Sequence, residues 1–176
     1  MHINNTKFLN FGSLNQDMVY SVDHTVRPGE TTASSKLEFF CGGKGLNQSI
    51  ALARAGAKVF HAGCVGSDGE RLLEKLKENG IDTSFIKKCD MPSGHAIIQV
   101  DKNGQNSILL FGGANKQIDE EQIAKVLSDF KAGDKLFLQN EINAVDKIIT
   151  AASKKGMEIV LNPSPFGDEI LSYPLD

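Results

Sequence analysis

The chain has 176 residues, of which 40% are hydrophobic and 23% are charged, and its net charge is −3. This length predicts one domain, or one domain with an appendage, and the composition is that of an ordinary globular protein rather than a disordered one. The net charge gives no basic surface for nucleic acid, and no apolar run approaches the ~20 residues that cross a bilayer. Because the N-terminus is polar and lacks the apolar core of a secretion signal, we expect a cytoplasmic protein without nucleic-acid or membrane partners.

The first stretch of interest follows a predicted buried strand at residues 8–12. Asn15 and Asp17 stand two residues apart, so in an extended segment their side chains would point to one face. A carboxylate accepts hydrogen bonds from neighbouring sugar hydroxyls more strongly than a neutral group does. The alternative is a turn, because Asn and Asp both favour turns.

Two hairpins are predicted next to the central pattern. Residues 18–22 and 35–40 alternate as strands around a turn at residues 27–30. Strands at 94–101 and 106–111 flank Asn103-Gly104, the strongest short signal for a hairpin. We expect the two hairpins to join as a small separate sheet, beside any ligand that Asn15 and Asp17 bind.

The segment Cys41-Gly-Gly-Lys-Gly-Leu-Asn47 places three glycines at a junction between a strand and a helix. Glycine allows close approach to the backbone, and the first N–H groups of a helix have no partner inside it. With Lys44 and the amide of Asn47 nearby, this arrangement suits a polyhydroxylated ligand. The alternative is a glycine-rich turn that only packs the helix against a sheet. The segment fits neither the phosphate-binding P-loop nor the dinucleotide fingerprint.

Alternation of strands and helices predicts a parallel sheet with helices on its faces. The predicted helices span residues 46–55, 70–79, 119–130 and 144–155, and further strands span 58–63, 135–139 and 157–162. Ser67 or Asp68 is expected to cap the second helix and Asp119 the third. Glu141 follows a strand at the end where open α/β sheets bind ligands, although it could equally favour the dipole of the helix that follows.

The cysteines and one histidine carry less weight. Cys41, Cys64 and Cys89 cannot all pair, and their spacing matches no zinc template, so we expect reduced, buried thiols. Cys41 adjoins the glycine segment, but no base is placed beside it, which disfavours a nucleophile. We expect His61, inside a predicted strand, to be a packed or edge residue rather than a metal ligand.

The whole chain resembles the ribokinase-like (PfkB) family of carbohydrate kinases. The motifs that carry the resemblance occur in the family's order: 12–17 (GSLNQD), 28–31 (PGET), 42–48 (GGKGLNQ), 55–57 (AGA), 80–82 (GID), 113–115 (GAN), 138–141 (LQNE) and 161–165 (LNPSP). The resemblance implies a Rossmann-like three-layer α/β sandwich with a small β-sheet lid. Residues 1–176 would form the N-terminal part of that domain, truncated on its C-terminal side, with lid hairpins at about 18–40 and 95–111.

By the same resemblance, the protein would phosphorylate a sugar hydroxyl with ATP, Mg²⁺ and a monovalent cation, as in the conversion of D-ribose to ribose 5-phosphate. The alternatives are a kinase for another sugar or a nucleoside, or a non-catalytic fragment that binds sugar or oligomerises. The resemblance also implies a homodimer formed through the lid. The residues implied to bind the sugar are Asn15, Asp17, Gly43, Lys44, Asn47 and Glu141.

The sequence departs from the family pattern in two places, of which only the second limits the expected activity. The turn at residues 66–69 is shorter than usual, and the Gly-Ala-Gly-Asp anion hole with its catalytic base has no counterpart in this sequence. Ala132-Gly133-Asp134 is no substitute, because it precedes a strand instead of opening a helix. No catalytic or metal-binding residue is therefore assigned, and we expect the 176-residue polypeptide alone not to turn over ATP.

Overall fold

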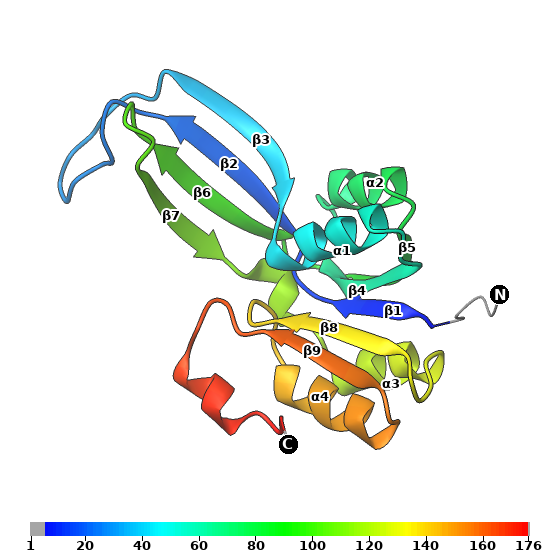
Figure 1. Cartoon of the computed structure of the whole chain (residues 1–176). Helices are drawn as coiled ribbons and strands as arrows, with labels where there is room; N and C mark the ends of the chain where they lie inside the picture. The colour runs from blue at the N-terminus through cyan, green and yellow to red at the C-terminus, as the bar shows by residue number, and fades with distance from the viewer. Residues whose placement is uncertain (1–5, 176) are drawn as a thin grey trace.

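A computed structural model describes residues 6–175 and contains two β-sheets (Figure 1). Residues 1–5, which contribute to the expectation of a cytoplasmic protein, lie outside the described part. The central sheet has five strands in the order β5-β4-β1-β8-β9, and every neighbouring pair is parallel. The bounds are β1 (Phe8–Phe11), β4 (Val59–Val65), β5 (Asp82–Lys88), β8 (Lys135–Gln139) and β9 (Glu158–Asn162).

Helices cover both faces of the central sheet, as Figure 1 shows. One core cluster packs Leu9 and Phe11 of β1 against one pair of helices, and another packs Val59 and Val65 of β4 against the second pair. Alternate side chains of a strand point to opposite faces, so β1 and β4 contribute to both clusters. The first pair is α3 (Glu120–Ser128) with α4 (Val145–Lys154), and the second is α1 (Lys44–Arg54) with α2 (Glu70–Glu78). The predicted three-layer α/β sandwich is confirmed; we call it the α/β body.

The second sheet projects from this body and contains both predicted hairpins (Figure 1). Its strands are β2 (Asn15–Ser21), β3 (Lys36–Gly42), β6 (Gly94–Val100) and β7 (Asn106–Phe111). The pairs β2–β3 and β6–β7 are antiparallel, and β2 and β6 lie parallel in the middle, so the order is β3-β2-β6-β7. The hairpins therefore form one small sheet, as expected, and we call it the lid sheet. Gly12–Leu14 joins β1 to β2, which places the start of the lid sheet beside the carboxyl end of β1.

Several local predictions differ from the structure. Strand β5 was not predicted, because residues 82–88 begin with three polar residues and end with two lysines, a pattern without clear alternation. Helix α1 begins at Lys44, two residues before the predicted start. Neither Ser67 nor Asp68 caps α2; the Asp68 carboxylate instead accepts a hydrogen bond from the Ser93 N–H at 2.9 Å. The Asp119 cap is confirmed, since its carboxylate accepts from the Gln122 N–H at 2.8 Å.

The remaining segments link the two sheets and follow the last strand. The 3₁₀ turn η1 (Gly113–Lys116) leads from the lid sheet back to α3, and η2 (Asp168–Ser172) follows β9.

All three cysteines are free thiols, but only Cys64 is fully buried, so the expectation of burial is wrong for Cys41 and Cys89. Among residues 6–175 no helix has the length and apolar character needed to span a membrane.

Candidate functional site

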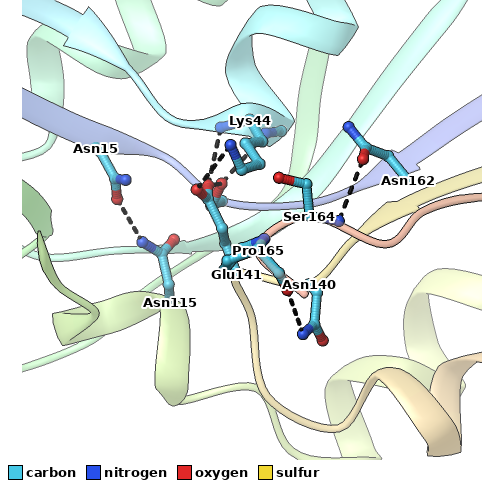
Figure 2. A network of polar contacts seen from close by, with 10 residues as sticks. Asn15, Lys44, Asn115, Asn140, Glu141, Asn162, Ser164 and Pro165 are labelled. Carbon is cyan, nitrogen blue, oxygen red and sulfur yellow. Dashed lines mark hydrogen bonds and ion pairs between the residues drawn. The ribbon is translucent and has the colours of Figure 1, made fainter. Parts of the chain in front are cut away.

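The candidate site lies where the lid sheet meets the carboxyl ends of β1 and β8. Three segments converge there: the Gly12–Leu14 connection, the start of α1, and the residues directly after β8. Figure 2 shows Glu141 at this junction, pointing toward Lys44 at the start of α1. Open α/β sheets bind their ligands at the carboxyl ends of their strands, so the position itself agrees with a binding site.

Glu141 is the best-anchored candidate. One carboxylate oxygen, Oε2, accepts hydrogen bonds from the Ser13 hydroxyl at 2.5 Å and from the Lys44 backbone N–H at 2.9 Å. The other oxygen, Oε1, lies 3.8 Å from the Lys44 ammonium, and only 9% of the Glu141 side chain is exposed. The Lys44 N–H is one of the unpaired donors at a helix N-terminus, where negative charge is favoured. Glu141 was predicted to bind a ligand or to interact with the dipole of the helix that follows it. The helix N-terminus that it contacts is that of α1, not that of the following helix α4.

The glycine segment brings the start of α1 against the Gly12–Leu14 connection. Gly43 has a φ of +96°, and a side chain there would approach the Ser13 carbonyl oxygen to 2.9 Å. Next to it, the Gly45 N–H donates to the Ser13 hydroxyl at 3.2 Å. At Gly45 any Cβ would overlap the backbone of Gly12 and Ser13. Backbone packing thus explains Gly43 and Gly45, as the alternative interpretation held, while the same packing orients Ser13 toward Glu141.

Asp17 provides a second carboxylate from the lid sheet. It lies on β2, where the register pairs it with Phe40 of β3, and a Cβ on Gly42 of the same strand β3 would overlap the Asp17 carboxylate. Burial raises the pKa of Asp17, and the nearby negative charge of Glu141 raises it further. Within residues 6–175 no hydrogen bond to this carboxylate is found. The two carboxylates therefore approach each other from separate parts of the fold, and Asp17 keeps its acceptor capacity for a ligand.

Asn15 is held by a residue that the sequence did not assign to the site. Its Oδ1 accepts from the Asn115 Nδ2 at 2.7 Å (Figure 2). Asn115 also donates to the Leu14 carbonyl at 3.2 Å and accepts from the Leu14 N–H at 2.9 Å. A Cβ on Gly94 would overlap this amide pair. Because Oδ1 of Asn15 is used internally, its Nδ2 group is the part that a ligand could contact.

The structure groups Asn15, Asp17, Gly43, Lys44 and Glu141, whereas Asn47 is exposed on α1. The backbone N–H of Asn47 donates to the Gly43 carbonyl at 3.0 Å, as expected one helical turn into α1. Sequence reasoning missed Ser13 and Asn115 as organising residues. Both stand inside motifs that were noted, at residues 12–17 and 113–115, but only the fold brings these motifs together.

No candidate metal site emerges from the described part of the chain, where no three His, Cys, Asp or Glu side chains are grouped closely enough to hold an ion. The site is therefore a set of hydrogen-bonding groups: two carboxylates, one ammonium and one free carboxamide N–H₂ group. Such a set matches a neutral ligand with several hydroxyls, since each hydroxyl both donates and accepts.

Comparison with known proteins defines the family. The model of the pfkB family of carbohydrate kinases matches residues 5–174. The chain belongs to this family. Ribokinase from Haemophilus influenzae is 38% identical over 169 residues, which cover 92% of this chain and 55% of the relative. Deoxyribokinase from Salmonella typhi is 35% identical over 168 residues, with the same coverage of 92% and 55%.

A solved structure gives the same result for the fold of this pfkB-family chain. The crystal structure of ribokinase from Cryptococcus neoformans in complex with ADP matches with a TM-score of 0.82 and 36% identity. The match covers 97% of this chain and 54% of that one. The predicted family and the ribokinase-like fold are thus confirmed, and the chain spans about half the length of the curated relatives it matches.

Proposed function

We propose that this chain supplies the sugar-binding half and the lid of an ATP-dependent sugar kinase of the ribokinase type, which converts D-ribose to ribose 5-phosphate. The observation that carries the proposal is the position of two carboxylates: Asp17, on the lid sheet, lies against Gly42, and Glu141, on the α/β body, accepts from the N–H of Lys44, two residues further along the chain. A sugar bound between them would connect the two parts of the fold. The names of the relatives from Haemophilus influenzae and Salmonella typhi support a pentose as the substrate.

The residues of the site would bind and orient the sugar. Glu141 is already oriented by Ser13 and Lys44, so it would accept a sugar hydroxyl without further ordering. Asp17 would accept from a second hydroxyl, and Asn15 would donate from its free Nδ2 group. Hydrogen bonds to charged acceptors are stronger than those between neutral groups. Fixing the sugar in this way would supply the positioning on which phosphoryl transfer depends.

ATP would supply the transferred phosphoryl group, with Mg²⁺ and a monovalent cation assisting. The residues that the structure describes do not fit these groups: they contain neither a phosphate-binding P-loop nor a cluster of metal-binding side chains. We therefore derive no step through them. We propose instead that the 176-residue polypeptide binds sugar but does not turn over ATP by itself.

The lid sheet is also the proposed site of homodimer formation. Large apolar side chains are exposed on it, including Phe40 (51% exposed), Ile108 (56%) and Leu109 (68%). Phe40 and Ile108 lie on the face of Asp17 and Leu109 lies on the opposite face, and large exposed apolar side chains are typical of surfaces that contact another chain. Dimer formation would bury part of this surface beside the sugar site.

A second candidate function is phosphorylation of 2-deoxyribose or another sugar, which the 35% identity to a deoxyribokinase favours. A nucleoside kinase and a non-catalytic module that binds sugar or oligomerises are the remaining alternatives. The sugar and nucleoside candidates differ in their ligand, so binding measurements separate them, and an assay of ADP release tests whether the polypeptide turns over ATP by itself.

The test is calorimetric titration of the 176-residue polypeptide with D-ribose, 2-deoxy-D-ribose and inosine, together with a coupled assay for ADP release. We expect D-ribose to bind most tightly and no ribose-dependent ADP release. If 2-deoxy-D-ribose or inosine binds most tightly, that compound replaces D-ribose as the proposed substrate. Binding of none of the three would contradict the proposed sugar site, and ribose-dependent ADP release would contradict the proposed division of labour.

A further inference from the structure

Beneath the candidate site, four polar side chains are completely buried between the central sheet and helix α1. Asn10, Ser49, His61 and Gln139 each have 0% of their surface exposed. Asn10 and His61 are direct register partners on β1 and β4, Gln139 ends β8, and Ser49 lies on α1. Buried polar side chains cost free energy unless they are hydrogen-bonded, so their grouping in an otherwise apolar layer requires an explanation.

The four side chains form one continuous series of hydrogen bonds. Gln139 Nε2 donates to Asn10 Oδ1 at 2.7 Å, and Asn10 Nδ2 donates to Ser49 Oγ at 2.7 Å. Ser49 Oγ lies 2.7 Å from His61 Nδ1, and His61 Nε2 lies 3.3 Å from the Gly12 carbonyl oxygen. A side branch runs from Asn10 Nδ2 to the Gly45 carbonyl oxygen at 2.6 Å.

The donor and acceptor of every hydrogen bond in the series follow from the two backbone carbonyl groups that it reaches, those of Gly12 and Gly45. A carbonyl oxygen only accepts, so His61 must carry its proton on Nε2. Burial lowers the pKa of His61 to about 4, which keeps the ring neutral, and Nδ1 must then accept from the Ser49 hydroxyl. Ser49 can in turn accept only from Asn10, whose N–H₂ group also donates to Gly45. All proton positions in the series are thereby determined.

The ends of the series lie in the three segments that carry the candidate site. Gly12 precedes Ser13, and Gly45 follows Lys44; Ser13 and Lys44 both donate to Glu141. Gln139 stands two residues before Glu141 on the same strand end. The series thus connects the backbone positions from which the groups around Glu141 extend.

One feature indicates that stability alone does not account for the series. The Gln139 Oε1 atom is buried and has no hydrogen-bond partner among the described residues. An unpaired buried acceptor is destabilising, whereas replacing both partners of a buried hydrogen bond by apolar groups can be nearly neutral. Gln139 therefore carries a destabilising unpaired oxygen, while its Nε2 group donates to Asn10 Oδ1 and, at 2.5 Å, to Gln48 Oε1 on α1.

We propose that Asn10, Ser49, His61 and Gln139 are positioning residues, and that their hydrogen-bond series holds Ser13 and Lys44 in register around Glu141. Without the series, the start of α1 could shift along the central sheet while the apolar contacts of the body persist. The effect on sugar affinity rests on the proposed function; the effect on the position of the backbone does not.

The test measures amide hydrogen exchange at Lys44 and Gly45, together with the affinity for D-ribose, in variants of the series and in one control variant. Ser49→Ala removes one oxygen from the middle of the series, and Asn10→Leu/Ser49→Ala/His61→Leu replaces most of it with apolar groups. The matched control is Gln122→Met, which removes a buried amide from the opposite face of the sheet, where Nε2 of Gln122 donates to the Gly63 carbonyl at 2.8 Å.

We expect Ser49→Ala to accelerate exchange at Lys44 and Gly45 by about fivefold, the loss expected for one hydrogen bond, and to raise the Kd for ribose by a similar factor. Gln122→Met should leave both readouts unchanged even if its melting temperature falls. His61→Gln, which retains an N–H donor, should resemble the wild type more than His61→Leu does.

Unchanged exchange at Lys44 and Gly45 in Ser49→Ala would overturn the proposal. If the triple variant does not fold, the Ser49→Ala variant alone is sufficient for this decision. Equal acceleration in Ser49→Ala and Gln122→Met would also overturn it, because the effect would then be general loosening. If the wild type binds no ribose, the proposed function fails, and the exchange rates still decide whether the series positions the backbone.

Discussion

The α/β body and the lid sheet differ in how far their apolar side chains are buried. In the body, strand side chains such as Leu9, Phe11 and Leu136 are completely buried, because a pair of helices covers each face of the central sheet (Figure 1). In the lid sheet, every residue of β7 is exposed, and Leu109 has 68% of its surface in contact with solvent. The body therefore buries its apolar side chains within itself, whereas the lid sheet leaves apolar side chains exposed that a ligand or another chain would cover.

The two parts also differ in how they treat buried polar groups. The body hydrogen-bonds nearly all of its own, as in the series from Gln139 to Gly12. At the base of the lid sheet, Asp17 is half-buried with no hydrogen bond from the described residues to its carboxylate. A group in this state has acceptor capacity that a ligand can use, which makes the lid sheet the adaptable half of the site.

The largest expected effect is on the stability of the body. Leu136→Ala removes a fully buried side chain from β8, and a change of this kind costs about 2–5 kcal/mol in the free energy of unfolding. Leu109→Ala, the same substitution in the lid sheet, should cost less than about 0.5 kcal/mol because the side chain is exposed. Denaturant unfolding of both variants makes the comparison, and equal losses would show that the lid sheet is packed as tightly as the body.

The second prediction concerns His61 and acid. Burial lowers the pKa of His61 from 6.5 to about 4, so the folded protein holds the ring neutral at a pH where the unfolded chain protonates it. The stability gained from neutral His61 is present above pH 6.5 and is lost as the pH falls toward 4. The full shift corresponds to about 3 kcal/mol.

His61→Leu has no such group, so its free energy of unfolding should depend less steeply on pH over this range. Chemical unfolding of both proteins at several pH values between 7.5 and 4 measures the difference. Parallel pH profiles would show that His61 is not buried in the neutral form.

The third prediction concerns sugar binding by the lid sheet. Asp17→Asn should weaken D-ribose binding about 10- to 100-fold, because a hydrogen bond to a charged group contributes about 1.5–3 kcal/mol. Glu38→Gln, on the neighbouring strand β3, is the matched control and should bind ribose normally. Calorimetric titration checks both variants, and equal affinity of Asp17→Asn and the wild type would remove Asp17 from the site.

The raised pKa of Asp17 has two further consequences of opposite sign. Ribose affinity should fall as the pH falls through the raised pKa, since the protonated carboxyl group is a weaker acceptor. The stability of the free protein should change the other way: the contribution of protonated Asp17 is present below the pKa of the unfolded chain and is lost as the pH rises through the raised pKa. Asp17→Asn should lack both effects, which distinguishes this pH dependence from that of His61.

The smallest expected effect concerns the two faces of the lid sheet. The strand register places Ile108 on the same face as Asp17, and Leu109 on the opposite face. On that opposite face, the loop between β2 and β3 covers part of the surface, since the Val26 N–H donates to Gln99 Oε1 at 2.8 Å. We therefore expect the dimer contact on the face of Ile108. Ile108→Glu should weaken dimerisation about tenfold or more, measured by sedimentation, whereas the reverse result for Leu109→Glu would assign the contact to the other face.

The sequence predicted the elements whose local chemistry is decisive. Asn103-Gly104 marked a hairpin, Asp119 capped α3, and alternating strands and helices indicated the parallel sheet; the structure confirms each of these. It did not predict β5, because an edge strand is exposed to solvent and does not need a regular apolar pattern. The predicted capping of α2 by Asp68 was wrong, because its carboxylate accepts instead from the Ser93 N–H, which is distant in the sequence.

The candidate site was predictable as residues but not as an arrangement. The residue types of Asp17 and Glu141 indicated a hydroxyl-binding site, yet their approach depends on the lid sheet joining the body at Gly12–Leu14. Ser13 and Asn115 act through partners about 100 residues or more away in the chain, which no local pattern reveals. Asn47 was predicted to bind the sugar and remains a prediction, exposed one helical turn beyond Lys44.

The most direct test of the central claim, that the lid sheet and the α/β body bind one sugar between them, is a crystal structure of the protein with D-ribose. We predict ribose hydroxyls at about 2.7 Å from a carboxylate oxygen of Asp17 and at a similar distance from Glu141. Ribose bound to only one of these two residues, or elsewhere on the molecule, would contradict the account.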